Sequence, residues 1–366
     1  MSGRRVIISG GGTGGHLYPA LVVGRKLREM DPAIELTYVG TDREVEKRIM
    51  EEHGVRFMPM RIEGLKGRGL RSLRALTLLP RSFARSWAVL RRTRPGLVVG
   101  VGGYSSGPIV LLASWLGIPT LILEQNARPG FTNRVLARWV RKAVVAFQGS
   151  LPYFKGKGVC LGNPVRDEFY ALPAKTRNGT LSVLVFGGSQ GSRFLNEKMT
   201  AALPLLAPLK DRFRIAHQTG PKELEGVAAG YRSYGFDAAG VAPYISDMAS
   251  AFRRADLVVC RAGATTLAEL IAARKASLLV PFAGASEDHQ TQNARAVEAV
   301  GGAEVVPEPR LTPEVLAGRL FHYLNCPADL DAMEAKILAL RVENPAGKIA
   351  ALGLSLMGRT PQETPA

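Results

Sequence analysis

The chain has 366 residues, of which 46% are hydrophobic and 22% charged, a composition that excludes a disordered protein. This length exceeds what one compact core usually holds, so we expect two domains. The formal net charge of +17 predicts an anionic partner, such as nucleic acid, an anionic membrane or a phosphorylated substrate. Cys160, Cys260 and Cys326 show no C-x-x-C spacing, so neither a disulfide framework nor a zinc site is expected, and a reducing cytoplasm is the expected compartment.

A glycine-rich turn follows the first apolar run and contains Gly10, Gly12 and Gly15. Glycine at a strand–helix turn lets a phosphate or a sugar approach the backbone at the helix N-terminus. The dinucleotide-binding form of this turn needs an acidic residue at the end of the second strand, where this chain has Thr41, so an oxidoreductase of that class is not expected. A turn that serves packing alone is the other interpretation.

His16 comes directly after this turn, at the predicted start of a helix. A helix N-terminus lowers the pKa of a histidine and keeps it neutral near pH 7, ready to accept a proton. We therefore consider His16 a candidate general base. A histidine that only caps or packs the turn is the alternative.

The segment from residue 61 to 94 is strongly basic, with Glu63 as its one acidic residue. Apolar residues recur in it at mostly three- and four-residue steps, with arginines between them, which is the pattern of a helix or helix–loop that lies in a membrane interface. Pro80 is expected to interrupt this helix and to leave a short exposed apolar tip. A core-facing helix with solvated arginines is the alternative. The expected membrane contacts are Leu76, Leu79, Phe83 and Trp87.

Residues 95–123 carry no charge and are long enough to be considered as a membrane span. Repeated glycines and prolines interrupt the stretch, however, as at Gly107, Pro108 and Pro119. Two buried strands joined by a glycine loop and a short helix explain it better.

Short apolar runs occur throughout the chain, each followed by a turn and a helical pattern. Near-continuous apolar strands that alternate with helices are typical of parallel sheets covered on both faces. The predicted fold class is therefore α/β, with two doubly wound Rossmann-like domains that face a cleft. The expected strands lie at 6–8, 36–39, 97–99, 120–123, 183–186, 213–216, 257–259 and 277–280.

The two halves of the chain open alike, since a second glycine turn at 187–191 follows the strand at 183–186. Residues 162–180 are rich in Pro, Gly, Asn and Ala, and we place the domain boundary there, between 1–164 and 165–343. In such sheets, ligands bind beyond the carboxyl ends of the strands.

Residues 260–269 follow a buried strand and begin a helix. Backbone amides from Ala264 to Leu267 can then meet diphosphate oxygens, and Glu269 can accept hydrogen bonds from two vicinal ribose hydroxyls. An ordinary strand–helix turn, with the glutamate placed to complement the helix dipole, is the alternative.

Two acidic groups are candidate metal sites. Asp329 and Asp331 form an Asp-x-Asp, but they begin a late helix and are expected to be acids of its first turns. Glu287, Asp288 and His289 have no spaced partner that would complete a site. We expect neither a protein-bound metal nor a cofactor.

Several motifs occur together, in order and at suitable spacing. As a set they closely resemble the MurG family of peptidoglycan N-acetylglucosaminyltransferases, which turn lipid I into lipid II, from about residue 4 to 356. The motifs are Gly11-Gly12-Thr13-Gly14-Gly15-His16, Gly102-Gly103-Tyr104, Glu124-Gln125-Asn126, Gly162-Asn163-Pro164-Val165-Arg166, Gly187-Gly188-Ser189-Gln190-Gly191 and Cys260-Arg261-Ala262-Gly263-Ala264.

The resemblance implies an inverting glycosyltransferase with two Rossmann-like domains and no catalytic metal. The donor would be UDP-N-acetylglucosamine, and the acceptor nucleophile would be the 4-hydroxyl of undecaprenyl-diphospho-N-acetylmuramoyl-pentapeptide (lipid I). The domain 1–164 would hold the acceptor and the membrane, 165–343 would bind the donor, and a last helix within 344–358 would pack back on the first domain. The enzyme would act peripherally, on the cytoplasmic side of the inner cell membrane.

Matched motif positions imply the site residues. The general base would be His16 or Glu124. Ile245 would lie at the uracil edge, and Gln290 rather than Gln292 would contact the donor, although residues 283–289 match the family loosely. The implied donor contacts are Thr13, Gly14, Gly15, Asn126, Arg166, Ser189, Ile245, Ala264, Thr265, Thr266, Leu267, Ala268, Glu269 and Gln290.

Three rival interpretations remain. A soluble transferase with a small acceptor would share the donor site but would not need the basic apolar segment. A UDP-sugar epimerase would share the donor and the two-domain arrangement but would need acidic pairs at the anomeric centre. A nucleic-acid-binding protein would fit the charge, but the chain has no recognisable nucleic-acid motif, so nucleic acid is not an expected partner.

Overall fold

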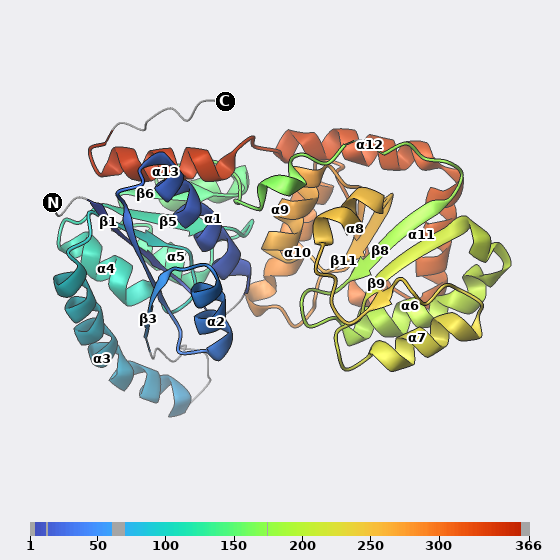
Figure 1. Ribbon diagram of the computed structural model, residues 1–366, viewed down its shortest axis with the longest axis horizontal. Helices are drawn as coiled ribbons and strands as arrows, with labels where there is room; N and C mark the ends of the chain where they lie inside the picture. The colour runs from blue at the N-terminus through green and yellow to red at the C-terminus, as the bar shows by residue number, and fades with distance from the viewer. Residues whose placement is uncertain (1–3, 12–13, 61–69, 174, 360–366) are drawn as a thin grey trace. The chain divides into compact units, whose positions relative to one another are not determined.

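The structure, a computed structural model, describes residues 4–11, 14–60, 70–173 and 175–359, and only the backbone of residues 14–16, 45, 70–79 and 286. The chain divides into two compact units (Figure 1). Unit 1 comprises Met1–Val165 with Val342–Ala366, and unit 2 comprises Arg166–Arg341. The boundaries expected from the sequence, after residues 164 and 343, lie close to these.

The described strands of unit 1 form one parallel sheet in the order β3-β2-β1-β4-β5-β6-β7. Every hydrogen-bonded pair in it is parallel. The order reverses between β1 and β4, as in a doubly wound sheet. The strands are β1 (Arg5–Ser9), β2 (Glu35–Gly40), β3 (Arg56–Pro59), β4 (Leu97–Gly100), β5 (Thr120–Glu124), β6 (Lys142–Val145) and β7 (Gly158–Cys160).

Successive residues of β1 point to opposite faces of this sheet and into two separate cores. Val6 and Ile8 pack with α1 (Gly14–Met30), α2 (Glu44–Glu52) and α13 (Pro345–Leu356). Ile7 packs with α3 (Leu70–Thr93), α4 (Gly107–Trp115) and α5 (Phe131–Leu136). A short 3₁₀ helix, η2 (Gln148–Phe154), precedes β7. The period-2 alternation of buried residues therefore places three helices on each face.

Unit 2 repeats this plan with a parallel sheet in the order β10-β9-β8-β11-β12-β13. One core contains Val183 and Val185 of the first strand together with α6 (Arg193–Leu206), α7 (Leu224–Ser233), α11 (Pro313–Asn325) and α12 (Pro327–Ile337). The helix α8 (Met248–Arg254) covers the opposite face through Phe252, whose ring lies 6.0 Å from that of Phe186. The strands are β8 (Leu181–Phe186), β9 (Phe213–Gln218), β10 (Val241–Ala242), β11 (Leu257–Cys260), β12 (Ser277–Leu279) and β13 (Glu304–Val305).

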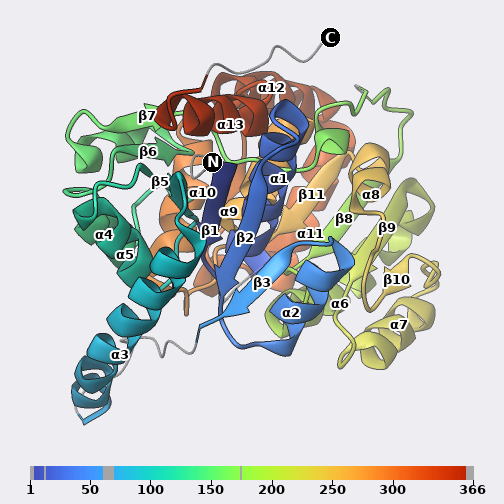
Figure 2. The same cartoon turned by 60° about the vertical axis from the view of Figure 1, so that its left-hand side comes forward.

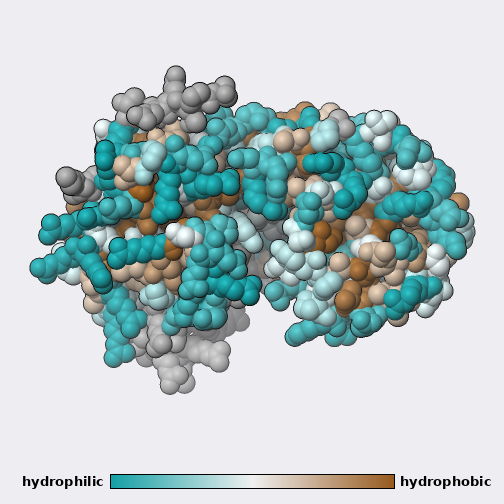
Figure 3. Space-filling view, in the orientation of Figure 1, coloured by the Kyte–Doolittle hydropathy of each residue, from teal (hydrophilic) through white to brown (hydrophobic). Residues whose placement is uncertain are grey.

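Helices precede, connect and follow these strands in the chain. The α-helices are α6 (Arg193–Leu206), α7 (Leu224–Ser233), α8 (Met248–Arg254), α9 (Ala264–Ala273), α10 (His289–Glu298), α11 (Pro313–Asn325) and α12 (Pro327–Ile337). The 3₁₀ helices are η3 (Asp167–Phe169), η4 (Ala207–Arg212), η5 (Ser286–Asp288), η6 (Glu308–Arg310) and η7 (Leu338–Leu340). Hydrophilic side chains cover most of the surface seen in Figure 3, with apolar residues showing between them.

The predicted fold class is confirmed: both units are α/β with a parallel sheet covered on both faces. Each of the eight predicted strands is present. The uncharged stretch 95–123 forms β4, α4 and β5, as expected. Among the described helices, none combines the length and the apolar character needed to cross a membrane.

One prediction about α3 is wrong. The helix does not break at Pro80 but runs without interruption from Leu70 to Thr93, and Figure 2 shows it beside α4 with its first turns extending past that helix. A proline removes one helical N–H bond, and because Pro80 is exposed, water can take the place of that bond. Ser82, Ser86 and Leu90 are buried in the second half of the helix, so packing on unit 1 holds the helix together beyond the proline.

Candidate functional site

The loops that follow β8 and β11 lie at the point where the strand order of unit 2 reverses. Ligands of doubly wound sheets bind there, beyond the carboxyl ends of the strands. The first loop carries the glycine turn 187–191, and the second leads through Gly263 into α9. The second glycine turn and the start of α9, for which the sequence predicts a diphosphate contact, are therefore neighbours at one edge of the sheet.

The glycine turn after β8 is packed backbone-to-backbone against the loop after β9. A Cβ on Gly191, which has φ +76°, would lie 2.0 Å from the carbonyl oxygen of Thr219, and one on Gly220 would lie 2.3 Å from that of Gln190. Only glycine fits at these two positions, because both need a positive φ and a close approach. Ser189 is exposed at the tip of the turn, where its hydroxyl is open to a ligand.

Gln218, at the end of β9, ties this turn to the loop that carries Ile245. Its side-chain amide donates to the carbonyl oxygen of Gly188 at 2.8 Å, and its Oε1 accepts the backbone N–H of Ile245 at 2.8 Å. The side chain is 1% exposed. The Ile245 N–H is therefore already engaged by Gln218, and the contact of Ile245 with a uracil stays a prediction.

Helix α9 starts with Gly263 as its N-cap, a residue with no side chain to cap the first turn. The early amides, those of Ala264, Thr265 and Thr266, lie at the positive end of the helix dipole, which favours an anion. Of the predicted amide contacts, that of Leu267 already has a partner within the protein, because its N–H donates to the carbonyl oxygen of Gly263 at 2.9 Å. The side chains of Leu267 and Ala268 are buried in the core.

Arg261 fixes the loop before α9. It is 7% exposed, and its guanidinium donates to Ser192 Oγ at 3.2 Å and to the carbonyl of Val280 at 3.1 Å, while it pairs with Glu308 at 2.5 Å. The Arg261 guanidinium is therefore paired and hydrogen-bonded within the protein. Arg261 joins α6, β12 and η6 behind the site, and a charged side chain with this many partners is a structural anchor rather than a ligand contact.

Glu269 lies in the second turn of α9 and is half-buried. Burial raises the pKa of its carboxyl to about 7, with Arg166 opposing the rise and Glu168 adding to it. Among the described residues, none forms a hydrogen bond with the Glu269 carboxyl. Its oxygens can therefore accept hydrogen bonds from a ligand. Arg166 pairs with Glu168 at 2.8 Å and lies over the Phe169 ring at 5.1 Å.

Gln290 is occupied by the protein itself. Its Oε1 accepts the backbone N–H groups of Ala262 at 3.2 Å and of Phe282 at 3.0 Å. It therefore holds the loop before α9 against the loop after β12. The choice between Gln290 and Gln292 as a donor contact stays a prediction.

In unit 1, the turn after β1 meets the loop after β4 in the same backbone-to-backbone manner. A Cβ on Gly103, with φ +79°, would lie 2.7 Å from the carbonyl oxygen of Gly11. This contact explains why both loops are rich in glycine. Thr13 lies outside the described residues; Gly14 and Gly15 begin α1, and His16 lies in its first turn, as predicted, with its side chain undescribed.

An acidic residue does lie behind this turn, although none ends β2. Glu46 of α2 is 5% exposed and accepts the backbone N–H of Thr41 at 2.8 Å and its hydroxyl at 2.6 Å. Its oxygens occupy the space that a Cβ on Gly11 or Gly40 would need. The sequence motif could not predict Glu46, because the motif expects an acidic residue at the end of the strand and Glu46 lies in a helix.

Glu124, the second candidate base, is buried at the end of β5 with four hydrogen bonds to its two oxygens. Asn126 donates through its backbone N–H at 2.9 Å and its side chain at 3.1 Å, Gly130 through its N–H at 3.0 Å, and Asn133 through its side chain at 2.9 Å. Burial raises the pKa of the carboxyl, and these donors oppose the rise. The geometry is that of a residue that positions Asn126 and the start of α5.

The comparisons with known proteins agree across both units. The Glycosyltransferase family 28 N-terminal domain matches residues 6–145, and the family 28 C-terminal domain matches residues 182–346. A relative from Myxococcus xanthus (strain DK1622), named UDP-N-acetylglucosamine--N-acetylmuramyl-(pentapeptide) pyrophosphoryl-undecaprenol N-acetylglucosamine transferase, is 46% identical over 97% of this chain and 94% of its own. The crystal structure of MurG from Acinetobacter baumannii matches with a TM-score of 0.80 and 30% identity, over 96% of this chain and 99% of that one.

The chain belongs to the MurG family. The resemblance predicted from the motifs is therefore confirmed. The fold by itself would not have decided this, because a putative UDP-N-acetylglucosamine 2-epimerase from Listeria monocytogenes matches with a TM-score of 0.69 over 99% of this chain and 100% of that one. Its sequence identity is only 13%, so that match shows the fold alone, whereas the MurG-family matches extend to the sequence.

Proposed function

We propose that this protein transfers N-acetylglucosamine from UDP-N-acetylglucosamine to the 4-hydroxyl of undecaprenyl-diphospho-N-acetylmuramoyl-pentapeptide. The observation that carries the proposal is the sequence identity of 46%, over 97% of this chain, to a relative named as an N-acetylglucosamine transferase. The edge of the unit 2 sheet supports it, with a glycine turn, a helix that starts at a glycine N-cap, and the Glu269 carboxyl in the second turn of that helix. A uridine diphosphate has a matching phosphate and ribose.

The chemistry is a single displacement at the anomeric carbon. The acceptor oxygen forms a bond to that carbon, the bond to the UDP oxygen breaks, the hydroxyl proton goes to a base, and UDP leaves as an anion. Arg166, Ser189 and the first amides of α9 would stabilise the leaving diphosphate, and fixed donors of this kind usually contribute the largest share of catalysis. His16 would be the base, and Glu124 would position Asn126, one of the proposed donor contacts.

Incubating the protein with labelled UDP-N-acetylglucosamine and a lipid I analogue tests this function. We expect a disaccharide-bearing lipid and one UDP for each sugar transferred, with no turnover of the donor when the acceptor is left out. Isomerisation of the donor sugar without an acceptor would instead establish an epimerase. Equal transfer to a small soluble acceptor that lacks the lipid would establish the rival transferase.

We also propose that unit 1 docks on the cytoplasmic side of the inner membrane, at a surface defined here as the aromatic cluster: Phe83, Trp115 and Trp139. The Phe83 and Trp115 rings stack at 6.2 Å, and Trp139 meets Trp115 edge-on at 5.9 Å. Trp115 is 56% exposed and Trp139 47%. Indole rings with one wet and one apolar side suit a membrane interface.

Basic residues lie on the same segments of the chain as the aromatic cluster. The Arg138 guanidinium lies over the Trp139 ring at 5.8 Å, and Arg81, Arg91 and Arg92 are exposed along α3. Each basic residue near an anionic leaflet contributes about 1 kcal/mol, so this surface favours an anionic bilayer. Trp87, a predicted contact, is 47% exposed on the same helix, whereas the side chains of Leu76 and Leu79 lie outside the described residues.

Replacing Trp115 and Trp139 together by serine is expected to lower the affinity for vesicles with anionic lipid by about tenfold or more, because two apolar rings no longer enter the interface. Both rings are largely exposed, so the fold should persist. Sedimentation with vesicles measures the effect, and calorimetry should find UDP affinity unchanged. Tyr234→Ser, at an exposed aromatic of unit 2, is the matched control. A folded double variant that sediments like the wild type would contradict the docking surface.

A further inference from the structure

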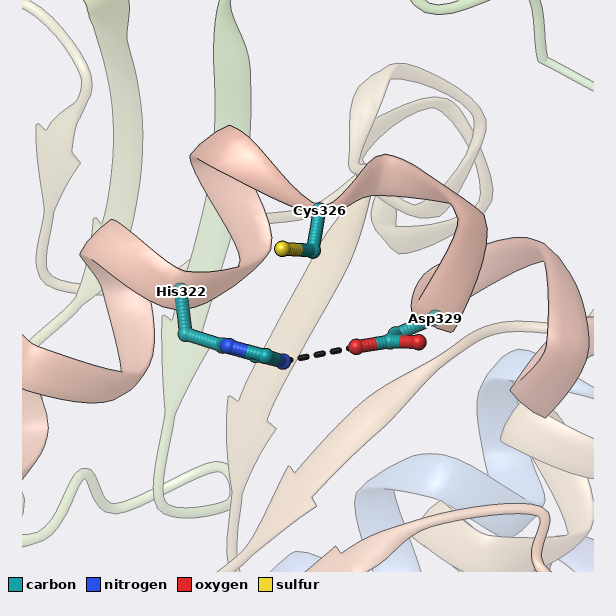
Figure 4. A group of neighbouring side chains, drawn as sticks. All are labelled: His322, Cys326 and Asp329. Carbon is teal, nitrogen blue, oxygen red and sulfur yellow. Dashed lines mark hydrogen bonds and ion pairs between the residues drawn. The ribbon is translucent and has the colours of Figure 1, made fainter.

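Three potential metal ligands gather where α11 meets α12. His322 comes from the last turn of α11, Cys326 from the junction, and Asp329 from the first turn of α12. Figure 4 shows the three side chains projecting toward one another. One ligand atom from each, nitrogen, sulfur and oxygen, lies within 4.8 Å of the other two, and all three residues are exposed.

The local sequence produces this arrangement. His322 and Cys326 are four residues apart and therefore lie on one face of α11, one turn from each other. Cys326 ends α11 and caps α12, and Pro327 begins the new helix, so Asp329 returns toward His322. Its Oδ2 lies 2.7 Å from His322 Nε2. Asp331 points elsewhere and pairs with Arg177, which divides the Asp-x-Asp between two different partners.

We propose that His322 Nε2, Cys326 Sγ and Asp329 Oδ2 form a binding site for a divalent transition metal of the zinc type, with water as the fourth ligand. Zinc takes nitrogen at ~2.0–2.1 Å, sulfur at ~2.3 Å and carboxylate oxygen at ~2.0–2.2 Å in tetrahedral sites. For such bonds, Cys326 Sγ has to come closer to the other two ligand atoms than 4.8 Å. His322 Nε2 and Asp329 Oδ2 have to move slightly farther apart than their present hydrogen bond. Exposed side chains reach both by small rotations. A thiolate and an imidazole select against magnesium and calcium.

The helix dipoles offer a simpler account of part of the group. A histidine in the last turn of one helix and an aspartate in the first turn of the next each complement a dipole, and their hydrogen bond needs no metal. That account gives the thiol no role. The metal site uses all three groups, so the contribution of Cys326 decides between the two.

The site lies away from the loops that carry the donor residues. Asp331 is tied to Arg177, which precedes β8, and Arg177 also pairs with Asp256, which precedes β11. The α11–α12 junction is therefore near the amino ends of these strands, whereas the donor loops follow their carboxyl ends. A metal here would join two helices and would take no part in sugar transfer.

Metal binding at this site is coupled to protons. The Cys326 thiol has to lose its proton to become a ligand, and neutral His322 has to carry its proton on Nδ1 so that Nε2 is free. Binding to the neutral imidazole therefore releases one proton, from the thiol.

Cobalt and zinc titrations of the reduced full-length protein test the proposal. We expect a thiolate-to-cobalt charge-transfer absorption in the wild type that Cys326→Ser abolishes. In competition with a chelator, zinc affinity should fall by at least about 100-fold in Cys326→Ser, since even a residue that only supports a ligand is worth ~10–100-fold. Cys160→Ser and His53→Ala are controls at a half-buried thiol and an exposed histidine, and both should bind like the wild type.

Two further measurements separate the outcomes. Zinc should raise the Tm of the wild type but not that of Asp329→Asn. The Asp329→Asn variant tests the site even if Cys326→Ser is poorly folded. Sugar transfer should continue after the metal is removed. Equal zinc affinity in the wild type, Cys326→Ser and Asp329→Asn, or a cobalt spectrum without a thiolate band, would overturn the site.

Discussion

Replacing Glu269 by alanine is expected to weaken UDP binding by about 10²–10⁴-fold. Two hydrogen bonds from ribose hydroxyls to a carboxylate are worth roughly 1.5–3 kcal/mol each, and about 1.4 kcal/mol corresponds to a factor of ten. The structural basis is a half-buried carboxyl near the start of α9 that no described residue engages in a hydrogen bond. Calorimetry with UDP measures the change, and Glu225→Ala, at an exposed position of α7, is the control.

The pKa of Glu269 adds a pH dependence with a defined sign. Burial raises this pKa from 4.5 to about 7 in the protein without ligand, and the ribose hydroxyls favour the ionised form. UDP affinity should therefore increase as pH rises through about 7. Glu269→Gln should lose this increase, while any titration of UDP itself stays in both proteins. A UDP affinity that is unchanged in the alanine variant would exclude the ribose role.

The same group affects stability in the opposite direction. Between pH 4.5 and about 7 the folded protein holds a proton on Glu269 that the unfolded chain releases. Its contribution to the free energy of unfolding therefore decreases as pH rises through that range. The carboxyl destabilises the fold at the pH where it is most able to bind, and the bound ligand would offset that cost.

His16→Ala is expected to reduce kcat by about 10²–10⁴-fold, the usual contribution of a general base, and to leave the Kd of UDP nearly unchanged. The proposed base acts only in the transition state, so ground-state binding does not need it. Single-turnover kinetics with saturating donor measures the first effect and calorimetry the second. Equal losses in both would make His16 a structural or donor-contact residue.

Glu124→Gln is the informative comparison for His16. The two oxygens of Glu124 accept hydrogen bonds from Asn126, Gly130 and Asn133. In Glu124→Gln an amide nitrogen would replace one of these oxygens, so that its N–H groups would face the N–H donors of the protein. This variant should lower the Tm, which His16→Ala should not. A loss of kcat in Glu124→Gln without any loss of stability would assign the base to Glu124.

The sequence allowed much of the fold to be predicted, because the central strands are buried on both faces. Val98 and Val258, for example, are 0% exposed and lie in near-continuous apolar runs. The strands that escaped prediction are short or lie at the edges of the sheets, as β3 (Arg56–Pro59) and β10 (Val241–Ala242) do. No residue of β3 is fully buried, and β10 has only two residues, so neither strand produces a long apolar run that stands out from the loops.

The site was predictable where a motif carried it and not where side chains from distant segments meet. Glycine turns and the start of α9 are local features with local signatures. Gln218, Arg261 and Glu46 act through partners on other loops, and their roles depend on contacts that no spacing reveals. Trp115 and Trp139 likewise join Phe83 only after α3, α4 and the segment after α5 have packed.

The return of the last helix to unit 1 sets an order for folding during synthesis. Ile349, Ala350 and Leu354 of α13 belong to the same core as Leu27 of α1, so that core stays incomplete until the ribosome has passed Leu354. Unit 2 is continuous from Arg166 to Arg341 and has all its residues earlier. Domains generally fold from the N-terminus onward as they emerge. Here the second unit is able to close first, and the first unit has to wait for its final helix.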